Sequence, residues 1–157
     1  MKKLIVALLL SLVVLLTSCG GLPELPFVII SNQMLTVNDE NAAPKIIVVT
    51  QTPASIPGIS PEDLPTLLNI DYSKDVAFVI FFDYKNPMIT KISQFKALTG
   101  SLTIWVQANF STSTTDTGFV NYQILSIKRA QINGRGKVLV RLLDNSFSEK
   151  NSMSFIN

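Results

Sequence analysis

The residue types that most often carry out catalysis are nearly absent from this chain. Its 157 residues contain no histidine and a single cysteine, Cys19. The missing histidines exclude imidazole acid–base catalysis and the common metal sites that use this ligand. One cysteine cannot form an intramolecular disulfide, so Cys19 is the only thiol that the chain could use. Any chemistry would otherwise depend on carboxylates, hydroxyls, amines and aromatic rings.

Carboxylates and serines are present, but their spacing does not indicate an active site. The adjacent acids Asp39-Glu40 and Glu62-Asp63 cannot face each other on a strand or helix, so we interpret them as a solvated loop and a helix N-terminus. The segment 71–75 has oxygen ligands but lacks the glycine and terminal glutamate of an EF-hand loop. No Gly-x-Ser-x-Gly motif occurs. We therefore predict a protein that is not an enzyme and has no cofactor and no metal site.

Trp105 is the best candidate for a contact residue. It falls on the polar face of a predicted strand, beside Gln107 and Asn109. An exposed tryptophan with amide neighbours can stack on a sugar or anchor a partner protein. Burial of this face under other elements is the alternative interpretation, because large rings are readily buried.

The basic residues gather near a predicted hairpin, where Lys128, Arg129 and Arg135 are candidate contact residues. Two of the thirteen basic residues lie in the first eighteen positions, so the remaining eleven match the eleven acidic residues. A neutral domain of this kind is not expected to bind nucleic acid. We interpret the cluster as a solvated strand edge or as a contact for anionic lipid headgroups.

Residues 1–18 have the pattern of a bacterial export signal. Two lysines precede a mostly apolar run, which is shorter than a membrane-spanning helix and ends in small residues. Leu16-Thr17-Ser18-Cys19 resembles the lipobox of bacterial lipoproteins, which implies a diacylglyceryl group on Cys19 and an extracytoplasmic domain anchored to the cell membrane or envelope. Two or more acyl chains would hold it there durably. A secreted protein with a free Cys19 is the alternative.

After residue 18, the sequence predicts one domain that is all-β or α+β. We expect a lipidated tether at 19–26, a β-rich globular domain at 27–144 and a polar C-terminal tail at 145–157. The domain should hold a mostly antiparallel sheet of about six strands and one short helix. Residues 60–69 have helix-start signals, whereas the apolar run 76–82 predicts a strand covered on both faces.

Two further turns shape this expectation. Gly100-Ser101 predicts the turn that joins two strands, the second of which alternates from Leu102 to Phe110. Asn133-Gly134-Arg135-Gly136 is a strong hairpin signal, so we expect the strand at 137–143 to pair with the strand before it.

The segment from Ile70-Asp71-Tyr72-Ser73-Lys74 to Phe82, with the later strand 122–128 (Tyr-Gln-Ile-Leu-Ser-Ile-Lys), resembles the PrcB C-terminal domain family. The resemblance covers about half of the chain after Cys19 and concerns strand order and spacing. It implies a lipoprotein, because members commonly are lipoproteins, and a role like that of the namesake, an accessory subunit of a surface protease complex. The family's Thr-Gly-Gly-Tyr turn is replaced here by Asn86-Pro87-Met88-Ile89.

These observations predict a non-enzymatic lipoprotein that binds or stabilises an envelope partner such as a protease. The alternative is a surface module that binds a glycan or a peptide through Trp105 or an apolar groove.

Overall fold

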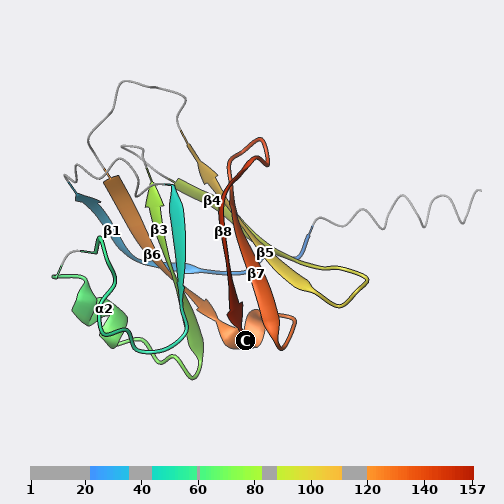
Figure 1. The fold of residues 1–157 in the computed structure, drawn as a ribbon, viewed down its shortest axis with the longest axis horizontal. Coiled ribbons are helices and arrows are strands. Elements are labelled where there is room, and N and C mark those ends of the chain that lie inside the picture. The colour runs from blue at the N-terminus through green and yellow to red at the C-terminus, as the bar shows by residue number, and fades with distance from the viewer. Residues whose placement is uncertain (1–21, 36–43, 60, 83–87, 111–119) are drawn as a thin grey trace, which may run out of the picture.

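The chain folds mainly as β-structure, as its sequence predicts. A computed structural model describes residues 22–35, 44–59, 61–82, 88–110 and 120–157. They form eight strands in two four-stranded sheets, with one short α-helix and one 3-10 turn (Figure 1). This confirms the expected class, a single mainly β domain with one short helix, although eight strands replace the expected six or so. The signal segment 1–18, Cys19 and the acids Asp39-Glu40 lie outside the described residues.

The first sheet is fully antiparallel and contains the most apolar strand of the chain. Its order is β1-β6-β3-β2, formed by β1 (Val28–Leu35), β6 (Val120–Lys128), β3 (Asp75–Phe82) and β2 (Lys45–Val49). Every residue of β3 is buried, because one face meets the second sheet and the other faces the layer that contains α2 (Leu64–Leu68). Coverage of both faces is what its continuous apolar sequence predicts.

The second sheet contains one parallel pair. Its order is β4-β5-β7-β8, formed by β4 (Met88–Lys96), β5 (Leu102–Asn109), β7 (Lys137–Leu143) and β8 (Glu149–Ile156). The pair β5–β7 is parallel and the other two pairs are antiparallel. Burial alternates along β5, which confirms the predicted inner face from Leu102 onward and leaves Thr103, Trp105 and Gln107 on the outer face.

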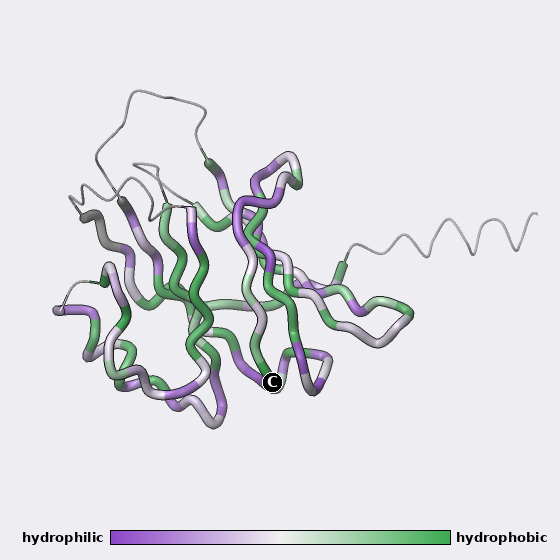
Figure 2. The backbone as a smooth tube through the Cα atoms, in the orientation of Figure 1, coloured by the Kyte–Doolittle hydropathy of each residue, from purple (hydrophilic) through white to green (hydrophobic). Residues whose placement is uncertain are grey.

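The two sheets pack face to face around the main core, and a smaller core lies on the far side of the first sheet. Figure 2 shows long hydrophobic stretches along the central strands. The main core takes alternate residues of the central strands of both sheets: Val76, Phe78, Ile80, Phe82, Leu102, Ile104, Val106, Val138, Val140 and Leu142. The smaller core joins Leu67 of α2 to the opposite side chains of β3 and β6.

The predicted hairpin at 133–136 is wrong, because the chain changes sheets there. After β6 the 3-10 turn η1 (Arg129–Gln131) leads into a loop in which Gly136 has a φ of 93°. Asn157 holds this loop through two backbone hydrogen bonds with Gly136 and a side-chain bond to the Gly134 carbonyl. Strand β7 therefore pairs with β5 and β8, while β6 pairs with β1 and β3. A glycine-rich turn predicts a change of direction, but long-range packing decides the partner strand.

The expected polar tail after residue 144 contains a strand. In β8, Phe155 is buried in the main core, and the side chains of Asn151 and Met153 cap the edge of β2. The amide of Ile46 donates to Asn151 Oδ1 at 3.2 Å, and the amide of Val48 donates to Met153 Sδ at 3.3 Å. These contacts protect an edge that could otherwise pair with another chain. The polar composition concealed this strand because most of its side chains are exposed.

The segment before β1 covers the outer edge of β4, so the folded domain begins before residue 27, its expected start. The Gln94 amide donates to the Pro23 carbonyl at 2.9 Å, and the Leu25 amide donates to the Ile92 carbonyl at 2.8 Å. Leu25 is buried in the main core. The predicted tether 19–26 is therefore too long, because its last residues pair with β4 before the chain crosses to the first sheet.

Helix α2, the one α-helix among the described residues, is shorter than the predicted segment 60–69. It has five residues, begins after Asp63 and ends before Asn69, and Ser60 lies outside the described residues. No helix in the described part of the chain has the length and apolar character needed to cross a membrane.

Candidate functional site

Trp105 lies in the middle of the outer face of the second sheet. Its register partners are Ser93 on β4 and Arg141 on β7, so three strands contribute to its surroundings. The side chain is half-buried, because neighbouring aromatic rings cover part of it. The prediction that Trp105 occupies the outer, polar face of its strand is therefore confirmed, and in the part of the chain that the structure describes no helix covers that face.

Phe95 and Phe147 flank Trp105, and we call these three side chains the aromatic face. The Phe95 and Trp105 rings stack at a centroid distance of 6.2 Å and an interplanar angle of 25°. Phe147 meets Trp105 edge-on at 6.3 Å and 69°. Phe95 is 43% exposed and Phe147 is 60% exposed. Such ring pairs are worth about 0.5–1.5 kcal/mol each beyond their buried area, so the cluster is preorganised while still presenting apolar surface.

Phe147 takes its position from a strained turn between β7 and β8. Its φ is 62°, the left-handed region that bulky residues avoid. Asp144 organises the turn, because its carboxylate accepts hydrogen bonds from the amides of Ser146 and Ser148 at 2.8 and 2.9 Å. The Ser148 amide, followed by the Lys150 ammonium, lowers the pKa of this carboxyl. Strain of this kind persists where surrounding structure enforces it, and it is typical of binding sites.

Charged pairs lie on the strands around the aromatic face. Arg141 Nη1 lies 3.4 Å from Glu149 Oε2, and Lys91 Nζ lies 2.8 Å from Glu24 Oε1. Lys91 and Arg141 are both on the outer face, in register with residues of β5 next to or at Trp105. An apolar centre with a charged rim is the usual anatomy of a protein-binding surface. The predicted turn at Gly100-Ser101 could have placed Phe95 near Trp105, but no local signal connects Trp105 to Phe147 or to the ion pairs.

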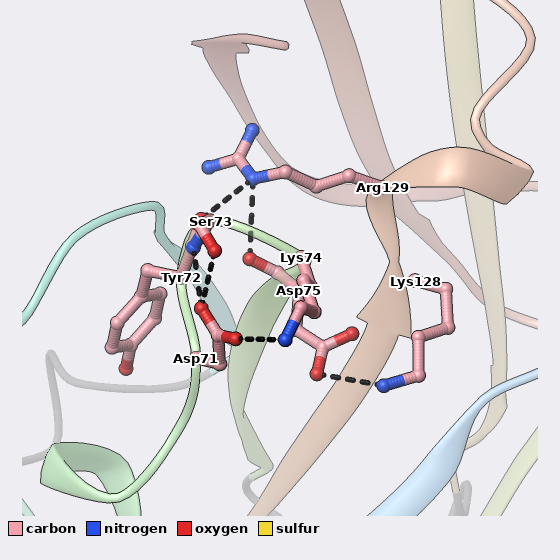
Figure 3. Close-up of polar contacts among 7 residues, drawn as sticks. All are labelled: Asp71, Tyr72, Ser73, Lys74, Asp75, Lys128 and Arg129. Atoms are coloured by element: carbon pink, nitrogen blue, oxygen red, sulfur yellow. Dashed lines mark hydrogen bonds and ion pairs between the residues drawn. The ribbon is translucent and has the colours of Figure 1, made fainter.

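A second polar cluster lies at the start of β3, at the segment 71–75 whose oxygen ligands drew attention in the sequence (Figure 3). Asp71 pairs with Lys74 at 2.8 Å and accepts hydrogen bonds from the Ser73 amide and hydroxyl. The Lys74 hydrogen bond, with those of Ser73, lowers the pKa of Asp71 to about 2, and Asp71 in turn raises the pKa of Lys74. Burial raises the pKa of Tyr72 to about 12. The charges of Asp71 and Lys74 are therefore paired with each other within this loop.

Of the three predicted basic contact residues, Arg129 has a structural role instead. Its guanidinium donates to the carbonyls of Tyr72, Asp75 and Thr50 and to the Asn157 side chain, at 3.0 to 3.2 Å. It therefore ties the ends of β2, β3 and β8 together; Figure 3 shows its bonds to Tyr72 and Asp75. The prediction of Arg129 as a surface contact is wrong, because an arginine with this many acceptors is held in place.

Lys128 and Arg135 remain accessible. Lys128 Nζ lies 2.9 Å from Asp75 Oδ2, and its side chain is 62% exposed. Asp75 is largely buried, and its Oδ1 atom has no hydrogen-bond partner among the described residues. Arg135 is exposed at the tip of the loop that leads to β7. The basic residues thus do not form one patch.

Asp63 lies at the N-terminus of α2, as the sequence predicts, but its side chain is turned into the fold. Only 6% of Asp63 is exposed, and its side chain makes no cap hydrogen bond. Its carboxylate accepts hydrogen bonds from Ser31 Oγ at 2.9 Å and from the Tyr122 hydroxyl. This contact joins α2 to two strands of the first sheet. Only the position of Tyr122 on a buried strand face could have hinted at it.

The sequence contains one Ser-x-x-Lys pattern, at Ser93-Gln94-Phe95-Lys96, and the fold separates its two reactive groups. The four residues lie on β4, where Ser93 faces outward beside Trp105 and Lys96 is in register with the inward residue Leu102. Side chains three residues apart on a strand point to opposite faces. This serine and lysine therefore cannot act together as they do in enzymes that place the motif on a helix.

The described residues offer little else in the way of sites. They contain no group of three or more acidic, histidine or cysteine side chains placed to hold a metal ion. One open depression of about 370 Å³ lies where the chain crosses between the sheets, lined by Pro26, Phe27, Val28, Ser126, Lys128 and Gln131. The aromatic face is the better candidate, because three elements hold its rings in place.

Comparisons with known proteins found nothing similar. No family model matches the chain, and no curated protein and no solved structure matches it. The function must therefore be inferred from the residues and their geometry.

Proposed function

We propose that this protein is a membrane-anchored extracytoplasmic lipoprotein without enzymatic activity, and that it binds a partner protein of the cell envelope through the aromatic face. The observation that carries the proposal is the cluster of Phe95, Trp105 and Phe147, which is exposed, preorganised and bordered by ion pairs. The anchor is the diacylated Cys19 indicated by the lipobox-like sequence Leu16-Thr17-Ser18-Cys19.

The chemistry of the aromatic face favours a protein as its ligand. Tryptophan, phenylalanine and arginine are enriched in protein interfaces, and tryptophan and arginine are typical of the residues that dominate binding energy. Here Arg141 is adjacent to Trp105 on the same face. The Phe95 ring stacks on Trp105, so the tryptophan contributes to a compact apolar ridge that could enter a partner's pocket. The resemblance to the PrcB C-terminal domain suggests a protease as the kind of partner.

The test is co-purification from native membranes after crosslinking, with an affinity tag placed after Asn157. We expect a reproducible partner from the wild-type chain and its loss in Trp105→Ala, because truncating a central interface tryptophan typically costs 2 kcal/mol or more, roughly a thirtyfold loss in affinity. Leu68→Ala is the matched control, since Leu68 is 45% exposed on α2, away from the second sheet. Cys19→Ser tests whether the interaction needs the anchor.

Each outcome discriminates between functions. A partner that remains bound to Trp105→Ala contradicts the aromatic face as its binding site. The alternative function is glycan or peptide binding through Trp105, which its stacked ring arrangement favours. A chain that recovers no protein, but binds a saccharide or peptide in a ligand screen and loses it in Trp105→Ala, would establish that alternative.

A further inference from the structure

The end of the sandwich where the described chain begins has a projecting apolar residue. Strands β4 and β5 are joined there by a tight turn, in which the Ala97 amide donates to the Ser101 carbonyl at 2.9 Å and the Gly100 amide donates to the Ala97 carbonyl at 2.8 Å. Gly100 has a φ of 87°, which closes the turn. Leu98 sits at its tip with a relative exposure of 109%, the highest among the large hydrophobic residues. Nothing in the described structure contacts it closely enough to explain a leucine there.

The proposed lipid anchor emerges beside this turn. The Gln94 amide bonds the Pro23 carbonyl, so the preceding residue, Leu22, continues along β4 toward the hairpin tip. Gln94 is four residues from Leu98, a distance of about 13 Å along a strand. Cys19 is three residues before Leu22, so their Cα atoms are at most about 11 Å apart. The first described residues lie against β4, on its edge opposite to β5 (Figure 1).

Three exposed cations surround the same end. Lys96 is in register with Leu102 at the base of the hairpin, and Lys137 precedes Val138, which pairs with Leu102 from the other side. Arg135 belongs to the adjoining loop, which packs closely enough that a Cβ atom on residue 134 would come within 3.0 Å of Leu102. Lys96, Arg135 and Lys137 make no ion pair within the described part of the chain.

We propose that this end of the sandwich is a second membrane contact, in which Leu98 inserts at the bilayer interface while Lys96, Arg135 and Lys137 meet anionic headgroups. The inference rests on the proposed anchoring at Cys19, because the anchor brings this end to the bilayer. An apolar tip ringed by cations matches an anionic lipid surface, which attracts basic residues electrostatically and accepts apolar side chains at the headgroup boundary. Two contact points would fix the orientation of the domain.

The test places a fluorescent label at residue 98 of the full chain. Lipidation consumes the Cys19 thiol, so Leu98→Cys supplies the only reactive thiol. The labelled protein is reconstituted into phosphatidylcholine vesicles that contain about one third phosphatidylglycerol and a lipid with a quencher near the headgroup. Ser146→Cys is the matched control, because Ser146 is exposed in the β7–β8 turn at the opposite end of the sheet. We expect several-fold stronger quenching at residue 98 than at residue 146.

The cations are tested in the same assay. A Lys96→Gln, Arg135→Gln, Lys137→Gln variant of the labelled chain should lose most of the additional quenching that phosphatidylglycerol causes over pure phosphatidylcholine. Circular dichroism checks that the variant keeps its β-structure, which is expected because all three side chains are exposed.

Failure of this contact and failure of the anchor give different results. Equal quenching at residues 98 and 146, in protein whose N-terminal peptide carries the lipid by mass spectrometry, overturns the second contact and leaves the anchor in place. A peptide that carries no lipid at Cys19 overturns both. Quenching at residue 98 that does not depend on phosphatidylglycerol overturns the role of the cations.

Discussion

Substitutions of Phe147 can measure how much folding stability the protein loses by holding this residue in the left-handed region. A residue with a side chain in the left-handed region costs about 1–2 kcal/mol relative to the right-handed helical region, and glycine largely avoids that cost. Glycine loses about 0.5–1 kcal/mol more than alanine in backbone entropy on folding. At a φ of 62°, Phe147→Gly should therefore be more stable than Phe147→Ala by about 0.5–1 kcal/mol. Both variants lose the edge-on contact with Trp105, so this contact cancels in the comparison.

The stability of each variant relative to the wild-type chain follows from the same reasoning. Loss of the ring contact costs about 0.5–1.5 kcal/mol, so Phe147→Ala should be about 1 kcal/mol less stable than the wild-type chain, while Phe147→Gly should be close to it. Urea denaturation followed by far-ultraviolet circular dichroism measures these free energies without using the fluorescence of the neighbouring Trp105. Phe147→Gly should nevertheless lose the partner protein, because the ring is absent.

Gly100→Ala is the control for the backbone term. Gly100 has a φ of 87° and no atom lies within 4 Å of the position that a Cβ would take, so its substitution measures the backbone strain less the entropy advantage of alanine, without a new contact. It should destabilise the protein by about 1 kcal/mol. The reasoning is refuted if Phe147→Ala proves as stable as Phe147→Gly while Gly100→Ala is destabilised, since that would show that residue 147 is not held in the left-handed region.

Three further predictions concern the polar contacts. Arg129→Ala should destabilise the fold by about 3 kcal/mol in urea denaturation, because three of its nitrogen atoms (Nε, Nη1 and Nη2) donate hydrogen bonds and each donor is worth about 1 kcal/mol. Exposed Arg135→Ala should change the stability by less than about 0.5 kcal/mol, and equal effects would contradict the structural role of Arg129. Tyr122→Phe should cost about 1–3 kcal/mol, because a buried carboxylate loses a donor, and a neutral result would contradict that hydrogen bond. The Asp71 carboxyl should titrate at about pH 2 by NMR, and Lys74→Ala should move this midpoint toward 3.8. Because the pKa of Asp71 is lowered in the fold, the ionised carboxylate contributes fully to stability above pH 3.8, and this contribution is lost as the pH falls through 2. An unchanged midpoint in Lys74→Ala would assign the shift to Ser73 alone.

The sequence predicted strands well, because side-chain periodicity is a local property. The alternation from Leu102 onward and the continuous apolar run of β3 both identified strands and the faces that they bury. The sequence wrongly predicted that β7 would pair with the strand before it, β6, because strand pairing depends on contacts between distant segments. Asn157 fixes the loop before β7, and no local signal connects residue 157 to Gly136. The polar strand β8 was missed for the related reason that its outward side chains dominate its composition.

The candidate site was predictable only in part. Trp105 could be placed on the outer face of its strand from the alternation alone. The Phe95 ring reaches Trp105 through the β4–β5 hairpin, whose turn the sequence predicted. The Phe147 ring comes from the β7–β8 turn, and only the sheet order brings it to Trp105. For Arg129 the sequence indicated the wrong role. Its charge suggested a surface contact, whereas its hydrogen-bond acceptors lie on three other segments of the chain.

The proposed anchor and the aromatic face would together limit where a partner can be. If Cys19 is held in the membrane as proposed, only Gly20 and Gly21 separate it from Leu22, and β4 holds Pro23 in the fold, so the tether would give the domain little reach. The strands of the second sheet lead away from the hairpin that carries Leu98. Eight residues of β5 span about 26 Å, which places Trp105 near half that height and Phe147 close to the far end. A partner that contacts all three rings must therefore approach within about 30 Å of the bilayer, which favours a protein that is itself held at the membrane over one that diffuses freely.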